Sequence, residues 1–191
     1  WTCIDAKNRN FGIITWPESK AGDLKVTGFE HKAANASPVT KEIQELAFRL
    51  IGEGAEEADV NSTLRPISIR LRKGEMTPQE IAPYGRLGKA SYDRVPPNAA
   101  KGALYYNANI NPDDPVRVND KAQWVYVNGV PHGMPTTNIV SFKDENEIAE
   151  FSLDYSLMVE KFIRAKLQSV YDTLGWNLGE ACGDATPKRY W

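Results

Sequence analysis

The stretch Asp144–Leu174 constrains this chain most, because its apolar residues recur at the spacing of a long amphipathic helix. They form two stripes: Ile148, Phe151, Tyr155, Met158, Phe162 and Ala165, and then Val159, Ile163, Leu167, Val170 and Leu174. From Tyr155 onward the stripes cover more than half of the helix circumference, which predicts that this part is buried. Ser152, Asp154 and Ser156 are poor helix formers and mark the expected break if two helices follow in tandem.

The ends of two predicted helices carry recognisable signals. Gly175 suits the left-handed position after a last helical turn, and Trp176 would then fold back on Tyr171. A second helix is predicted to begin at Ser37-Pro38, since proline is favoured at the first helical position. Its apolar stripe consists of Ile43, Leu46, Ala47, Leu50 and Ile51. The sequence therefore predicts two main helices.

Short strands are predicted elsewhere. They are Phe11–Trp16, Leu24–Phe29, Thr63–Lys73, Ala103–Ile110, Gln123–Val127 and a return strand after Val130. The third of these alternates apolar and polar residues in the order Ile67, Ser68, Ile69, Arg70, Leu71 and Arg72. Such alternation is typical of a strand with one buried face. The opposite face would then present Arg70 and Arg72 together, about 7 Å apart.

The predicted fold class is α+β, an antiparallel sheet of short strands with the two main helices packed on one side. The first two strands are expected to pair as a hairpin, and Asn128-Gly129 is a strong turn signal for another. We expect a single globular domain over residues 1–176 and an irregular C-terminal tail over residues 177–191. The 41% apolar content suits a domain with a core. No apolar run is long enough to predict a membrane span.

Two cysteines, Cys3 and Cys182, lie near opposite ends of the chain. They could form one disulfide in an oxidising compartment, or remain two separate thiols in a reducing one. Their spacing does not decide between these alternatives. The sequence therefore assigns no compartment.

Charge is segregated along the chain. Residues 61–101 carry eight basic and three acidic side chains, a net charge of +5, although the whole chain has a net charge of −2. Such a segment can bind a polyanion or complement an acidic surface on another copy of the chain. The candidate contact residues are Arg65, Arg70, Arg72, Lys73, Arg86, Lys89, Arg94, Tyr84 and Tyr92. Arginine suits phosphate contacts and tyrosine can stack on bases, so single-stranded nucleic acid is a candidate partner.

No phosphate-binding loop, dinucleotide fingerprint, nucleophile elbow or metal-binding motif is found in the sequence. We therefore expect no cofactor and no metal. The best enzyme alternative is a hydrolase or transferase with a site near His132, which Cys3 or Asp113 could approach. Asp113-Asp114 and Glu56-Glu57 could hold a hard cation, although turn acidity explains both pairs without one.

The leading functional hypothesis is a non-enzymatic structural subunit that self-assembles into a coat, tube or filament. It would be a homo-oligomer, with nucleic acid as a further partner of its basic central segment. The missing catalytic motifs, the segregated charge and the edge-type hairpins favour this hypothesis. The two alternatives are the small enzyme with a site near His132 and a monomeric nucleic-acid-binding module.

Overall fold

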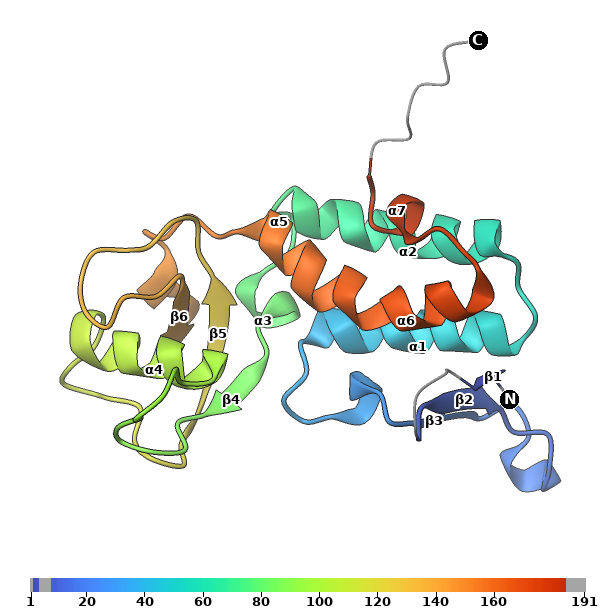
Figure 1. Ribbon diagram of the computed structural model, residues 1–191, viewed down its shortest axis with the longest axis horizontal. Helices are drawn as coiled ribbons and strands as arrows, with labels where there is room; N and C mark the ends of the chain where they lie inside the picture. The colour runs from blue at the N-terminus through green and yellow to red at the C-terminus, as the bar shows by residue number, and fades with distance from the viewer. Residues whose placement is uncertain (1, 4–7, 185–191) are drawn as a thin grey trace, which may run out of the picture. The chain divides into compact units, whose positions relative to one another are not determined.

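The computed structural model describes residues 2–3 and 8–184, and these residues adopt an α+β fold, which confirms the predicted class. They are 46% helical and 13% strand. The strands form two separate antiparallel sheets of three strands each, whereas one sheet was expected (Figure 1).

The described residues contain seven α-helices, one π-helical segment, three 3-10 turns and six strands. The α-helices are α1 (Pro38–Gly52), α2 (Glu57–Arg72), α3 (Pro78–Ile81), α4 (Asn98–Asn109), α5 (Tyr155–Met158), α6 (Ala165–Leu174) and α7 (Leu178–Ala181). The π-helical segment is η4 (Val159–Arg164), and three 3-10 turns are η1 (Glu18–Lys20), η2 (Glu30–Lys32) and η3 (Glu145–Ile148). The strands are β1 (Thr2–Cys3), β2 (Asn10–Ile13), β3 (Leu24–Thr27), β4 (Tyr84–Arg86), β5 (Lys121–Tyr126) and β6 (Ile139–Phe142).

The chain divides into two compact units. Unit 1 comprises the described parts of Trp1–Ala33, Val39–Glu75 and Val159–Trp191. Unit 2 comprises Ala34–Pro38 and Met76–Met158. The expected single domain over residues 1–176 stays a prediction.

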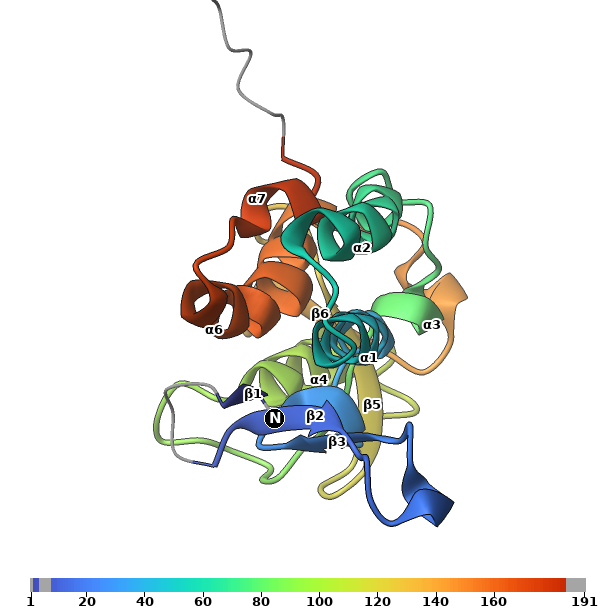
Figure 2. The same cartoon turned by 90° about the vertical axis from the view of Figure 1, so that its right-hand side faces the viewer.

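In unit 1 the sheet β1-β2-β3 packs beside α1 (Figure 2). The predicted hairpin of the first two long strands is confirmed, since β2 pairs antiparallel with β3. Phe11 of β2 stacks on Phe48 of α1 with ring centroids 4.3 Å apart, and Phe29 packs against Phe48 at 4.7 Å. Aromatic packing thus joins this sheet to α1.

The predicted strand Thr63–Lys73 is wrong, because these residues belong to α2 and to the residue after it. The buried residues of this helix are Val60, Asn61, Leu64, Ile67, Ser68 and Leu71. They recur every three or four residues, so they form one helical stripe. Ser68 interrupts the apolar pattern of that stripe, which made the alternation of Ile67, Ile69 and Leu71 look like a strand.

The predicted helical stretch Asp144–Leu174 is not continuous. Residues 149–154 are not helical, so the break expected near Ser152 and Asp154 is confirmed, whereas Ser156 lies inside α5. The Asp154 carboxylate accepts a 2.8 Å hydrogen bond from the Leu157 amide and so helps to begin α5. Gly175 has a φ of 71° after α6, and the rings of Tyr171 and Trp176 are 5.7 Å apart, as the sequence predicted.

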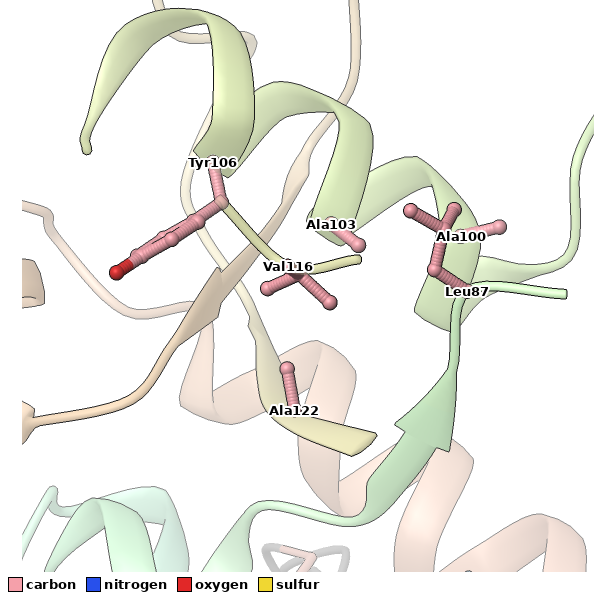
Figure 3. Close-up of a cluster of buried hydrophobic side chains, with 6 residues drawn as sticks. All are labelled: Leu87, Ala100, Ala103, Tyr106, Val116 and Ala122. Carbon is pink, nitrogen blue, oxygen red and sulfur yellow. The ribbon is translucent and has the colours of Figure 1, made fainter. Parts of the chain in front are cut away.

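In unit 2, α4 packs against the sheet β4-β5-β6 (Figure 1). Figure 3 shows the buried cluster where Ala100, Ala103 and Tyr106 of α4 meet Leu87, Val116 and Ala122. The predicted strand Ala103–Ile110 is therefore wrong. Its two tyrosines favoured a strand by propensity, but both are buried on α4.

The predicted strand Gln123–Val127 is confirmed as most of β5, and Trp124 packs on Tyr126 with ring centroids 5.4 Å apart. Its return strand is β6, which begins at Ile139 rather than directly after Val130. Residues 128–138 form a long connection instead of a tight Asn-Gly turn.

Cys182 is a buried free thiol, so of the two alternatives that the sequence leaves open, the disulfide with Cys3 is not formed. Burial raises the pKa of the Cys182 thiol to about 11. The expected irregular tail 177–191 contains the short helix α7, and its last seven residues lie outside the described residues.

Candidate functional site

The nine predicted contact residues divide between the two units. Four of them lie on or directly after α2 in unit 1, namely Arg65, Arg70, Arg72 and Lys73. The other five lie on β4 or in the connection after it in unit 2, namely Tyr84, Arg86, Lys89, Tyr92 and Arg94.

Arg70 and Arg72 were predicted to lie on one face, but on α2 they do not. Residues two apart on an α-helix point about 200° apart, so Arg70 and Arg72 diverge. The Arg65 guanidinium donates a 3.3 Å hydrogen bond to the Glu180 carbonyl, and Arg72 donates a 2.9 Å bond to the Cys182 carbonyl. These two arginines hold the segment that contains α7, so their contacts are explained within unit 1.

Gly85, the middle residue of β4, faces α4, so the side chains of Tyr84 and Arg86 lie on the other face of the strand. A Cβ atom at Gly85 would lie 2.0 Å from the Cβ of Ala99 and 3.3 Å from the indole nitrogen of Trp124. Glycine therefore permits the close approach of α4 to this strand. Tyr84 and Arg86 alternate with Gly85 and lie on the opposite face, where both are exposed.

Arg86 lies directly opposite Lys121 in the antiparallel pairing of β4 with β5. Two like charges in this relation destabilise a sheet. Within residues 8–184, neither the guanidinium nor the ammonium group has a hydrogen-bonded or ion-paired partner. The Asp120 carboxylate, next in sequence to Lys121, accepts a 3.0 Å hydrogen bond from the Arg117 amide, within the turn before β5.

These two cations line a pocket of about 360 Å³. Its lining consists of Ala34, Asn35, Tyr84, Gly85, Arg86 and Lys121. Tyr84 is 46% exposed, so its ring is accessible beside the two positive charges. Asn35 and Lys121 were not predicted as site residues, and only the pairing of β4 with β5 brings Lys121 to Arg86.

The connection after β4 is folded around the hydroxyl of Tyr92. This oxygen accepts 3.1 Å hydrogen bonds from the backbone amides of Gly88 and Lys89. Tyr92 also packs against the buried cluster of Figure 3, so it supports the connection rather than offering a free ring. Lys89 and Arg94 are exposed on either side of it.

His132 lies exposed in the connection between β5 and β6. Its backbone carbonyl accepts a 2.7 Å hydrogen bond from the Tyr105 hydroxyl. Among residues 8–184, no hydrogen bond joins His132 to Asp113, and the side chain of Cys3 lies outside the described part of the structure. The enzyme alternative stays a prediction.

In residues 2–3 and 8–184, no group of three or more His, Cys, Asp and Glu side chains is arranged to hold a metal ion. None of the helices formed by these residues is both long and apolar enough to cross a membrane.

Comparison with protein-family models and with curated protein sequences finds no match.

Proposed function

We propose that this chain binds single-stranded nucleic acid through the exposed face of β4 and the beginning of β5. The phosphate backbone would lie at Arg86 and Lys121, with a base against Tyr84. The observation that carries this proposal is the cross-strand pair of cations that has no partner in the described residues and lines a pocket.

Holding Arg86 and Lys121 opposite each other costs free energy. Two positive charges held opposite each other repel, so the sheet would be more stable with neutral residues at these positions. A phosphate bound by both groups would remove the repulsion and gain charge-assisted hydrogen bonds. Backbone contacts of this kind are indifferent to base sequence and weaken as salt is added.

Tyr84 favours nucleic acid over a small anion. Its ring lies on the same face of β4 as Arg86, one alternation away along the strand. Aromatic rings beside a basic groove stack on the unpaired bases of single strands, which present both faces of the base. Lys89 and Arg94 would extend the backbone contacts along the next connection.

The direct test measures binding of the whole chain to a fluorescently labelled single-stranded oligonucleotide at about 20 mM salt, where phosphate contacts are strongest. We expect saturable binding that is weaker in the Arg86→Gln/Lys121→Gln variant. Absence of any binding by the wild-type chain at this salt would refute the proposal.

Self-association is a second candidate function, favoured by exposed apolar side chains in unit 2. Val95, Val130 and Met134 are all exposed, and Val95 and Val130 line a groove of about 420 Å³ together with Leu104 and Pro135. Exposed apolar patches are typical of protein contacts, and a second copy of this chain is the partner proposed here. Light scattering at increasing protein concentration tests it, and a chain that stays monomeric at high concentration and low salt would contradict it.

A further inference from the structure

In unit 1 two arginines converge on one carboxylate. The Arg72 Nη2 atom lies 3.3 Å from Asp184 Oδ1, and the Arg164 Nη2 atom lies 2.5 Å from Asp184 Oδ2. Each oxygen of the Asp184 carboxylate thus forms an ion pair with one guanidinium group. Arg72 comes from the last turn of α2 and Arg164 from the end of η4.

The donors of Arg72 are only partly used by this carboxylate. Its Nη2 atom also donates a 2.9 Å hydrogen bond to the Cys182 carbonyl, but its Nε atom is buried without a hydrogen-bond partner in the described part of the chain. The Nε and Nη2 hydrogens form the planar edge that matches two oxygens of an oxyanion. Both Asp184 oxygens are already engaged, whereas a phosphate has a further oxygen to offer Nε.

The charges around the two arginines would favour an anion once Asp184 moves away. Glu160 accepts a 3.0 Å hydrogen bond from Arg164 Nε, so two cations face two carboxylates in the described arrangement. Without the Asp184 carboxylate, the arginines exceed Glu160 by one positive charge. The buried Cys182 thiol adds no charge at neutral pH, because burial raises its pKa to about 11.

Asp184 can leave this position without unfolding α7. Its side chain is 44% exposed, and within the described part of this segment only its backbone amide is held, by a 2.9 Å hydrogen bond to the Gly179 carbonyl. Rotation of one side chain into water would therefore open the two guanidinium groups. Their side chains are 35% and 25% exposed, so an ion can reach them.

We propose that Arg72 and Arg164 form a binding site for a phosphate group, which Asp184 occupies when no ligand is present. Asp184 is then an internal competitor that lowers the affinity of the site. The phosphate can be a free phosphate ion or part of a nucleic-acid backbone. This site lies in unit 1 and does not depend on the function proposed for β4.

Nuclear magnetic resonance of the arginine Nε–H groups tests the proposal in the whole chain. Inorganic phosphate is titrated at constant ionic strength, with chloride as the balancing anion, and the Arg72 and Arg164 signals are followed. We expect both signals to shift in Asp184→Ala at about tenfold lower phosphate than in the wild type. A site occupied by its own carboxylate nine-tenths of the time binds about tenfold more weakly.

Asp172→Ala is the matched control, because this exposed carboxylate on α6 pairs with Gln168 alone among the described residues. It changes the net charge equally and should leave the phosphate affinity unchanged. Arg72→Lys in the Asp184→Ala background should lose the gain, because lysine lacks the planar two-donor edge. Equal phosphate affinity in Asp184→Ala and the wild type, or no shift of either arginine signal, would overturn the proposal.

The two sources of phosphate are separated in the Arg86→Gln/Lys121→Gln background, in which the β4 site is disabled. Tighter binding of a labelled single-stranded oligonucleotide on adding Asp184→Ala would identify a nucleic-acid backbone as the ligand. Tighter binding of inorganic phosphate alone would identify the free ion. Both results support the site, and failure of the β4 proposal would leave the arginine signals as an independent measurement.

Discussion

The hydroxyl of Thr40 donates a 2.7 Å hydrogen bond to the backbone carbonyl of Phe162, and both residues are buried. One turn further along α1, the Gln44 amide donates a 3.1 Å bond to the Lys166 carbonyl. Phe162 lies in the π-helical segment η4, where the regular helical hydrogen-bond pattern is interrupted. Side chains of α1 thus satisfy carbonyl groups of the η4–α6 segment, in addition to apolar packing.

We predict that Thr40→Val lowers the free energy of unfolding by about 1–3 kcal/mol. Valine has nearly the shape of threonine but leaves the buried Phe162 carbonyl without this donor. Denaturant titration measures the change. Thr173→Val is the matched control, because the Thr173 hydroxyl donates to the Ser169 carbonyl at an exposed position. A loss in Thr40→Val no larger than in Thr173→Val would contradict this interpretation.

Truncation of Phe162 tests whether this helix is part of the core. Phe162 is 5% exposed, so Phe162→Ala should leave a cavity and cost about 3–5 kcal/mol. Trp16→Ala removes an aromatic ring that is 81% exposed and should change the free energy of unfolding by less than about 0.5 kcal/mol. If Phe162→Ala cost less than about 1 kcal/mol, this face of the helix would not be a buried one.

The sequence predicted α1 and α6, because their terminal residues and their apolar spacing both favour the helices that the structure contains. Pro38 begins α1 and Gly175 follows α6, and both helices carry apolar residues at three- and four-residue spacing. Helices α2 and α4 were missed for a physical reason. Ser68 takes a buried position on α2, and Tyr105 and Tyr106 are strand-favouring residues on α4, so tertiary packing overrides local propensity there.

The candidate site could be predicted only in part. Tyr84 and Arg86 were singled out from composition, but Lys121 was not, because it is separated from Arg86 by 34 intervening residues of the sequence. The register of β4 on β5 places these two cations opposite each other, and sequence pattern alone does not determine the register of two distant strands. Arg72 was assigned to an exposed strand face, whereas it contacts the Cys182 carbonyl in the structure.

We predict that Gly85→Ala destabilises unit 2. The new methyl group would lie 2.0 Å from the Ala99 Cβ, so α4 and β4 would have to separate, at a cost of about 1–3 kcal/mol. In the control Gly88→Ala, the nearest atom to the new methyl group is the Tyr92 hydroxyl at 3.6 Å, an ordinary contact. Thermal unfolding compares the two variants, and equal melting temperatures would show that the close approach at Gly85 is not required.

The carboxylate of Glu30 should make stability depend on pH in the acidic range. Burial alone would raise its pKa, but hydrogen bonds from Lys166 at 2.9 Å and Gln44 at 3.2 Å contribute to a pKa below its ordinary value of 4.5. The folded state therefore binds this proton less readily than the unfolded state. The stabilisation is complete above pH 4.5 and is lost as pH falls through the folded-state pKa.

The comparison that isolates Glu30 is the difference in free energy of unfolding between the wild type and Glu30→Gln, measured by denaturant titration at several pH values. We expect the wild type to be more stable near pH 7, with the difference shrinking below pH 4.5, because glutamine does not titrate. A difference that stays constant from neutral to acidic pH would show that the charge of Glu30 is not what Lys166 stabilises.

The salt dependence of single-stranded oligonucleotide binding tests the central claim most directly. It is measured by fluorescence anisotropy for the wild type, for Arg86→Gln/Lys121→Gln, and for the control Lys20→Gln/Lys161→Gln. The control removes the same charge from exposed positions in unit 1. Our account predicts that the first variant binds more weakly and that its log–log salt slope is shallower by about 1.4, since each single-strand phosphate contact contributes about 0.7. An equal salt slope for Arg86→Gln/Lys121→Gln and for the control Lys20→Gln/Lys161→Gln would contradict it. Absence of binding by the wild type at about 20 mM salt would contradict it too.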